Sequence, residues 1–272
     1  MKNILLIAFV IVGFYSCKST FSKLEKSTDY EYKFQKAVEY YNKEDYVRAS
    51  TLFESLVNVW RGTSKAEDVN FFNAQCYYKM QDYISAGYYF RNFAKTFPNS
   101  KYTSEAFYLS AYCFYLDSPP VNLDQSSTLQ AINELELYLT RFPEDTAKVN
   151  ECNRLIDNLR LKLQEKSFIN AKLYFDLGQY KAAIIALKNA IKDYPESDYN
   201  DQLKYLVVKS CYLLASNSIE TKQKERFEKT ITEYRDYKDM FPKGKYLKEV
   251  EKMSENSQKQ LKKIEKTTNN TK

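Results

Sequence analysis

The chain has 272 residues, with 25 Tyr and 17 Phe but no His, and with only 5 Gly, 6 Pro and 5 Cys. Without histidine, Ser-His-Asp and Cys-His catalytic groups and His-ligated metal sites are excluded. The glycines are too scattered for a dinucleotide-binding turn or a phosphate-binding loop, both of which need clustered glycines. Since 44% of the residues are apolar and 28% are charged, the composition indicates a folded protein. We expect no enzymatic activity, no cofactor and no metal site.

The formal net charge of +6 is concentrated at the end of the chain. Nine Lys and four acidic residues follow residue 242, and Lys2 stands alone before residue 3, which leaves 31 basic and 31 acidic residues between 3 and 242. Nucleic-acid-binding domains usually carry a basic stripe on their folded part, so we expect no nucleic-acid partner. The basic segment 243–272 is interpreted as a solvated terminal helix and tail. The alternative is a contact with an anionic surface or an acidic partner.

The first segment has the features of an export signal. Lys2 precedes an uncharged run at residues 4–15, and Ser16 and Cys17 follow it. A membrane-spanning helix needs about 20 apolar residues, so this run is too short for one and has the length of the apolar part of a signal peptide. We expect a signal peptide at residues 1–16 and a polar tether at residues 17–29.

The end of that segment resembles the lipobox of bacterial lipoproteins, in which the cysteine becomes the acylated first residue of the mature chain. This resemblance implies a lipid on Cys17, and Lys18, a residue other than Asp, is compatible with sorting to the outer membrane. Phe14 and Tyr15 depart from the lipobox pattern, which usually has Leu and a small residue there. Ordinary secretory cleavage nearby and an uncleaved anchor are the alternatives.

The four remaining cysteines are expected in the core. Cys76, Cys113 and Cys211 recur in similar contexts, Ala-Gln-Cys-Tyr, Ala-Tyr-Cys-Phe and Lys-Ser-Cys-Tyr. The recurrence predicts equivalent, small buried positions. Although Cys152 makes the number even, no two of these cysteines are closely spaced, so we expect neither a disulfide framework nor a metal site.

An aromatic residue followed by proline recurs through the chain and marks a repeat. The four pairs are Phe97-Pro98, Phe142-Pro143, Tyr194-Pro195 and Phe241-Pro242. A small residue stands twelve positions before each proline and a large one eight before it, and this spacing places both on one helix face. The small residues are Ala86, Ala131, Ala183 and Thr230, and the large ones are Phe90, Leu135, Leu187 and Tyr234. Because proline ends a helix, each pair predicts the end of the second helix of a hairpin.

A second small residue, upstream of each of these helices, marks the first helix of the hairpin. Ala37, Ala74 and Ala171 are each followed three residues later by Tyr, and a further copy without the proline fits at Arg61. The third repeat contains a loop at residues 117–124, the fifth is expected to loop around residues 217–223, and residues 147–177 are expected to form one continuous helix. The predicted fold is an all-α solenoid of five helical hairpins, at about 30–61, 65–98, 101–143, 147–195 and 199–242, followed by a C-terminal helix.

The repeat pattern, A-x3-F-x7-P with an upstream A-x2-Y, resembles the tetratricopeptide repeat. With the lipobox-like start, residues 30–243 resemble the BamD family of lipoproteins, which belong to the outer-membrane β-barrel assembly machinery. The passages that carry the resemblance are residues 41–46 (YNKEDY), 81–83 (QDY), 97–100 (FPNS), 171–180 (AKLYFDLGQY) and 194–197 (YPES).

The resemblance implies an adaptor held in the outer membrane by a lipid on Cys17 and facing the periplasm. Its N-terminal repeats would receive the C-terminal signal of unfolded β-barrel proteins. Its C-terminal repeats would dock on the periplasmic domains of the central barrel protein, and accessory lipoproteins of the machinery would be further partners.

Two other classes of function stay open at this point. A general tetratricopeptide lipoprotein scaffold in cell-envelope organisation fits the same residues. An enzyme would need a pair of carboxylates, and Glu134 with Glu136 or Asp198 with Asp201 supply such pairs. These acids stand in repeat-end or exposed helix positions, which favours a solvated surface over a catalytic site.

Aromatic residues three before and four after the small residue of the first helices form a candidate peptide-binding groove. Seven residues make nearly two helical turns, so both members of a pair lie on one side of their helix. Stacked repeats would then present a wall of rings with hydroxyl groups for an extended peptide. The alternative is that these rings fill the contacts between repeats. The eight positions are Phe34, Tyr41, Phe71, Tyr78, Tyr108, Tyr115, Phe168 and Phe175.

Lipidation can be tested by mass spectrometry of the mature N-terminus. We expect a chain that begins at Cys17 and carries the mass of its acyl groups, because acylation precedes cleavage in lipoproteins. The Cys17→Ser variant is the control and should lack that mass. An unmodified N-terminus at another residue in the wild-type chain would contradict lipidation.

Overall fold

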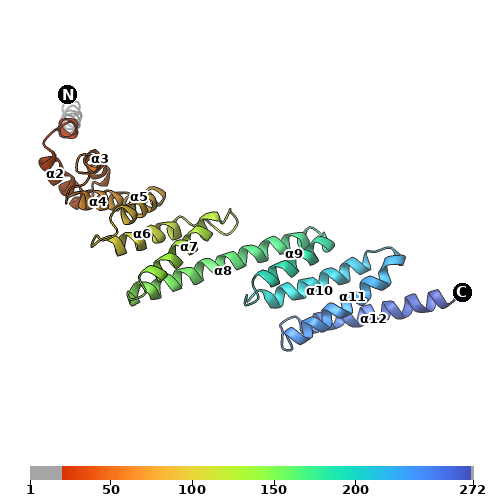
Figure 1. Ribbon diagram of the computed structural model, residues 1–272. Helices are drawn as coiled ribbons and strands as arrows, with labels where there is room; N and C mark the ends of the chain where they lie inside the picture. The colour runs from red at the N-terminus through yellow and green to blue at the C-terminus, as the bar shows by residue number, and fades with distance from the viewer. Residues whose placement is uncertain (1–19, 271–272) are drawn as a thin grey trace, which may run out of the picture. The chain divides into compact units, whose positions relative to one another are not determined.

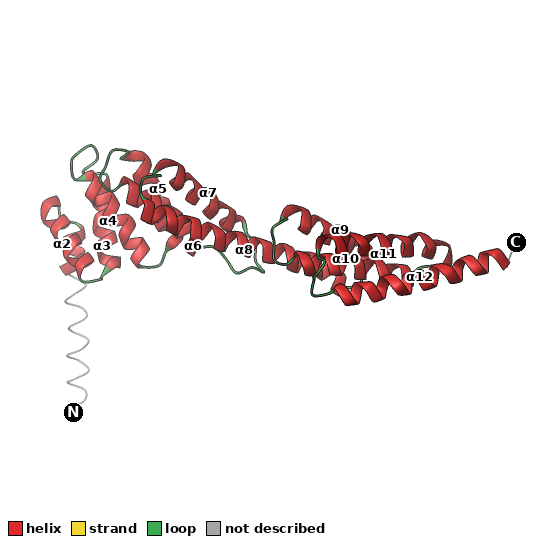
Figure 2. Cartoon of the chain, turned by 90° about the horizontal axis from the view of Figure 1, so that it is seen from below, coloured by secondary structure: helices red, strands yellow, loops and turns green. Residues whose placement is uncertain are grey.

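The computed structural model describes residues 20–270. In this range the chain consists of helices joined by turns, and no strand is present (Figures 1 and 2). Residues 20–25 are helical. The later helices are α2 (Tyr30–Asn42), α3 (Tyr46–Val57), α4 (Ala66–Lys79), α5 (Tyr83–Thr96), α6 (Thr103–Leu116), α7 (Ser126–Arg141), α8 (Thr146–Asp176), α9 (Tyr180–Asp193), α10 (Asn200–Ser216), α11 (Glu220–Met240) and α12 (Leu247–Asn270).

Helices that follow one another in the chain pack together. The contacts run from α2 to α3, α4, α5, α6 and α7 in turn, and from α9 to α10, α11 and α12. The predicted all-α fold of consecutive helical hairpins is confirmed. The continuous helix expected at residues 147–177 is α8, and the loop expected at residues 117–124 lies between α6 and α7.

The chain forms two compact units. The first contains the described residues up to Pro120 together with Asp124–Leu159, and the second contains Val121–Leu123 and the described residues from Arg160 onward. The first half of α8 therefore belongs to the first unit and its second half to the second unit. In the part of the chain that the structure describes, no helix combines the length and the apolar character that a bilayer span requires.

The turns inside three hairpins share one backbone conformation. Glu44 (φ 61°), Gln81 (φ 62°) and Gly178 (φ 71°) take the left-handed conformation directly after the first helix. The next residue donates its backbone N–H back to Tyr40, Tyr77 or Tyr174, as in a Schellman turn. In the first two hairpins this next residue is Asp45 or Asp82, whose carboxylate also accepts from the N–H groups of Arg48 and Ser85 to cap the second helix.

The prolines of the repeat pattern stand just after the ends of the second helices, as predicted. The aromatic residue before each proline is the C-cap of α5, α7, α9 or α11, and its N–H still bonds to the helix four residues back. Since proline has no N–H, that bonding stops there.

The small residues of the repeat lie where helices meet in the first unit. Six alanines have no exposed surface, namely Ala37, Ala49, Ala74, Ala86, Ala111 and Ala131. Phe53, Phe90 and Leu135, each four residues after the alanine of a second helix, are equally buried. At Gly87 the helices also approach closely, because a Cβ there would lie 3.3 Å from the Cβ of Cys113 on α6. Small and large positions together set how near the helices pack.

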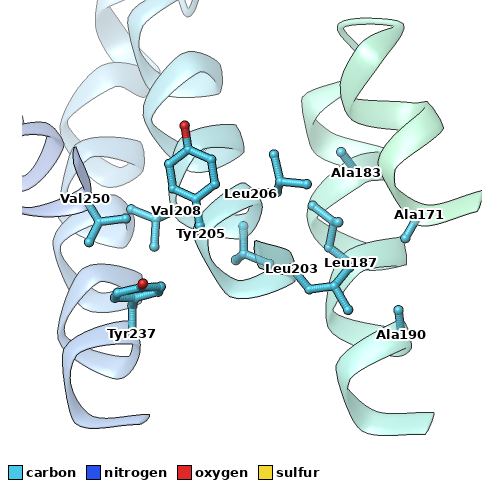
Figure 3. Packing of buried hydrophobic residues seen from close by; sticks show 11 residues of the cluster. Ala171, Ala183, Leu187, Ala190, Leu203, Tyr205, Leu206, Val208, Tyr237 and Val250 are labelled. Atoms are coloured by element: carbon cyan, nitrogen blue, oxygen red, sulfur yellow. The ribbon is translucent and has the colours of Figure 1, made fainter. Parts of the chain in front are cut away.

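The second unit is organised around α10. Leu203 and Leu206 lie on the side of α10 that faces α9, where Ala183 and Leu187 are buried, and Val208 lies on the side nearer α12 (Figure 3). Ala171 of α8, Tyr237 of α11 and Val250 of α12 complete the same cluster. Every described helix of this unit therefore contributes to one core.

The cysteines of the described residues are buried and free, which confirms their predicted core positions. Burial raises the pKa of Cys76, Cys113 and Cys211 to about 12 and that of Cys152 to about 11. Because the thiolate is the reactive form, these side chains act as small apolar groups.

Two segments differ from the expectation. Residues 20–25 were expected to be part of a polar tether, but they are helical, and Phe21 and Leu24 pack against the core of the first hairpin. The guanidinium of Arg48 lies 5.6 Å from the Phe21 ring centre, which adds a cation–π contact. These apolar side chains can be buried only because the first hairpin is close by.

The loop expected around residues 217–223 is shorter, because α11 begins at Glu220. The amide of Gln223 donates to the carbonyl of Ser218 over 3.0 Å, which satisfies a backbone acceptor left free by the end of α10. The carboxylate of Glu220 lies in the first turn, where the helix dipole favours a negative charge.

A buried ion network joins three helices of the second unit. Glu233 of α11 is 3% exposed and pairs with Lys204 of α10 over 3.1 Å and with Lys188 of α9. Lys204, itself 7% exposed, also lies 3.4 Å from Asp236. Burial alone would raise the pKa of Glu233, but the hydrogen bonds and charges of the two lysines outweigh it and hold that pKa below its ordinary value.

The network predicts a defined loss of stability in the variant Glu233→Gln. The change leaves the ammonium group of Lys204 buried without its main partner, which costs about 3 kcal/mol of unfolding free energy. Chemical denaturation followed by circular dichroism measures the loss. The control is Glu228→Gln on the exposed side of α11, which should change stability by less than about 0.5 kcal/mol.

The network also predicts that Glu233→Gln changes how the free energy of unfolding depends on pH. A carboxyl whose folded pKa is depressed stabilises the fold above its unfolded pKa, near 4.5, and this contribution is lost as the pH falls through the lower folded value. Glu233→Gln should therefore lose less stability than the wild-type chain on acidification below about pH 4.5. Equal losses would contradict the assignment.

Candidate protein-binding site

The eight aromatic positions fall into both units. Six lie in the first unit, on α2, α4 and α6, and two lie on the part of α8 that belongs to the second unit. Seven of the eight side chains are partly exposed, and Phe71 is buried. We call the six rings of the first unit the aromatic wall: Phe34, Tyr41, Phe71, Tyr78, Tyr108 and Tyr115.

The rings of α2 contact the second helix of their own hairpin and the next first helix. Phe34 packs edge-on against Phe53 and Trp60, with ring centres 6.0 and 5.2 Å apart. Tyr41 lies 5.6 Å from Tyr46 and 5.3 Å from Phe72 of α4. Phe72 was not among the predicted positions, and it links the first two hairpins.

The two rings of α4 have different surroundings. Phe71 stacks on Tyr102 at 4.3 Å and also contacts Phe90 and Phe93, so it belongs to the core of the second hairpin. Tyr78 packs at the edges of Tyr83 and Phe90 and keeps part of its surface exposed. On α4, therefore, Tyr78 and not Phe71 is the ring that a partner could contact.

On α6 three tyrosines form a continuous stack. Tyr112 lies between Tyr108 and Tyr115, with both ring distances 5.8 Å and interplanar angles of 9° and 11°. All three are partly exposed, and the ammonium of Lys148 lies 5.4 Å from the centre of Tyr108. Tyr112 was not predicted, because only the positions three before and four after the small residue were considered. Its spacing from Tyr108 and Tyr115 nevertheless places it on the same helix face.

The two rings of the second unit lie against neighbouring helices. Phe168 stacks on Tyr199 at 4.7 Å, and Phe175 lies 5.9 Å from Tyr180. The ammonium of Lys209 is 5.6 Å from the centre of Phe175 and bonds to the hydroxyl of Tyr205 at 3.0 Å. Both phenylalanines are packed against the core of this unit and keep part of their surface exposed.

Three tyrosines of the aromatic wall are less acidic than a free tyrosine. Burial raises the pKa of Tyr41 and of Tyr78 above the ordinary value, and it raises that of Tyr108 to about 12. A neutral phenol both donates and accepts hydrogen bonds and offers an apolar face beside them. This chemistry suits the backbone and side chains of an extended peptide.

The second unit carries a different, apolar surface where α8, α9 and α10 end or begin. Gly178, Tyr180, Ile185 and Leu214 are among the residues that line a hollow of about 600 Å³. Several large apolar side chains of this unit are strongly exposed, among them Leu177 at 62%, Ile185 at 59% and Ile219 at 72%. Exposed apolar residues of this size are typical of protein contact surfaces.

One acid of each pair that could have indicated an enzyme contacts other groups of the fold. Glu134 pairs with Arg91 over 2.7 Å. Asp201 accepts hydrogen bonds from the Tyr237 hydroxyl and from the backbone N–H of Lys245. Over residues 20–270 no cluster of three or more potential metal ligands occurs. Cys17, the predicted lipidation site, lies outside the described residues.

Comparison with known proteins assigns the chain to a class. A family model described as "YfiO: Outer membrane lipoprotein" matches residues 27–224, which include α2 to α10. No curated protein matches the chain in sequence.

Two solved helical-repeat structures are similar at low identity. One is the TPR domain of P58(IPK), with 15% identity over 89% of this chain and 68% of that chain, at a TM-score of 0.40. The other is the TPR2AB domain of yeast Sti1 in a pHSP90 complex, with 13% identity over 84% of this chain and 98% of that chain, at a TM-score of 0.38.

The helices form an all-α fold of consecutive hairpins, and the matching family model is described as an outer-membrane lipoprotein. Because the family model covers most of the chain, the protein belongs to the YfiO family of outer-membrane lipoproteins, the family of BamD.

Proposed function

We propose that the protein is a lipid-anchored periplasmic adaptor in the assembly of outer-membrane β-barrel proteins. The observation that carries the proposal is the match to the outer-membrane lipoprotein family over residues 27–224. A lipid on Cys17 holds the chain at the membrane, and the repeats extend from it into the periplasm. The protein works by binding and not by catalysis.

The first unit is the proposed receptor for unfolded β-barrel segments. The partly exposed rings of the aromatic wall give an extended strand apolar faces for its alternate side chains and hydroxyl groups for its backbone. The cation of Lys148 beside Tyr108 adds a partner for a carboxylate of the bound chain.

The second unit is the proposed docking site for the central barrel protein and its accessory lipoproteins. Its exposed apolar residues Leu177, Ile185 and Ile219 supply an area that a folded periplasmic domain could cover. Lys181 lines the hollow there and, with Lys222 and Arg226, a neighbouring one of about 340 Å³. An apolar centre with charged residues around it is the usual arrangement of a protein interface.

Depletion followed by outer-membrane proteomics tests the proposal. We expect a general loss of β-barrel proteins on depletion and recovery with the wild-type chain. The variant Tyr78→Ala/Tyr115→Ala should restore them poorly, because it removes two exposed rings of the aromatic wall. The matched control is Tyr88→Ala on α5, which truncates a tyrosine that is 61% exposed and should restore them fully.

One outcome would contradict the role in β-barrel assembly, and another would contradict the role of the aromatic wall. A narrow change that leaves most β-barrel proteins at normal abundance would point to a dedicated envelope scaffold. Full recovery with the double variant would remove the aromatic wall from the mechanism while leaving the family role intact.

A further inference from the structure

The last helix forms a basic groove together with α10. Tyr212 of α10 and six side chains of α12 line a hollow of about 580 Å³. The α12 residues are Asn256, Lys259, Gln260, Lys262, Lys263 and Lys266. The family match ends at residue 224, so the helix that supplies most of this groove lies beyond it.

Among residues 20–270 the four lysines of the groove have no acidic partner. Over the described residues none of them makes an ion pair or a side-chain hydrogen bond, and no Asp or Glu lines the hollow. Elsewhere in this unit Lys188 and Lys204 are paired with Glu233. Like charges gathered around one hollow repel one another, so an anionic ligand is favoured there.

One side of α12, with apolar residues and two serines, faces the rest of the unit. Val250, Ser254 and Ser257 are buried, and Leu247 and Met253 pack against the core of the second unit. From Leu247 to Thr267 no large apolar side chain of this helix is strongly exposed. A helix that lies in a membrane surface needs exposed apolar residues to insert, so the groove is better suited to a chain than to a lipid surface.

We propose that this groove binds an acidic, extended segment of a partner protein. Carboxylates of the segment pair with Lys259, Lys263 and Lys266, which follow one another along the helix at spacings of four and three residues and so share one face. An apolar or aromatic side chain of the segment packs on Tyr212, whose ring is only partly buried. This surface is separate from the aromatic wall and does not depend on the proposed role in β-barrel assembly.

A fluorescent peptide, in which runs of glutamate flank a single tryptophan, is the probe. Fluorescence anisotropy measures its binding to the full mature chain in mild detergent. We expect binding that weakens as salt is raised, because the contacts are between exposed charges. The corresponding peptide with glutamine in place of glutamate should not bind.

Matched triple variants separate the groove from net charge. Lys259→Gln/Lys263→Gln/Lys266→Gln should weaken binding by about tenfold or more, as expected for the loss of three partly exposed charge pairs. Lys243→Gln/Lys248→Gln/Lys252→Gln removes the same charge from exposed lysines outside the groove and should change affinity by less than about twofold. The Arg version of the groove triple keeps the charges and should retain binding.

Three results would overturn the proposal. The first is the absence of binding of the acidic peptide to the wild-type chain, and the second is an equal loss in the two Gln triples. The third is binding of vesicles of phosphatidylethanolamine and phosphatidylglycerol through the same lysines when the peptide does not bind. That result would assign the groove to a lipid surface. Thermal unfolding of each variant shows that a loss of binding is not a loss of fold.

Discussion

The close approach of helices at fully buried alanines is the constraint on which the rest of the structure depends. Ala37, Ala74 and Ala111 on first helices, and Ala49, Ala86 and Ala131 on second helices, have no exposed surface. A larger side chain at any of them would push two helices apart, since a packed interior has no room for it. The rings of the aromatic wall are spaced three before and four after the alanines of the first helices, so the same contacts that build each hairpin also determine where its rings lie.

Features that depend on neighbours in sequence could be predicted. The buried alanines, the aromatic C-caps before proline and the unbroken α8 up to Gly178 all follow from helix periodicity and local backbone rules. Features that depend on distant residues could not. The pairing of Glu233 with Lys204 and Lys188 joins three helices, and the packing of Phe21 requires the first hairpin to be in place. Phe71 and Tyr108 occupy the same position of the repeat, three residues before the small residue of a first helix. Only Phe71 is buried, because Tyr102, Phe90 and Phe93 surround it.

Both units carry surfaces whose chemistry suits contact with other chains. In the first unit each tyrosine ring presents an apolar face beside a hydroxyl group, so it can pack on apolar groups and still bond to a peptide backbone. In the second unit a core around α10 supports exposed apolar residues on one surface and a basic groove on another. Surfaces of different chemistry select partners of different chemistry.

The most direct test of the central claim is a titration of the chain with a peptide that matches the last strand of an outer-membrane β-barrel protein. Isothermal calorimetry should show one site on the wild-type chain and a loss of affinity of about thirtyfold or more in Tyr78→Ala/Tyr115→Ala, since truncating an interface aromatic costs about 1 kcal/mol or more each. The Tyr88→Ala chain should bind as the wild type does. Unchanged affinity in the double variant, or equal losses in both variants, would contradict the account.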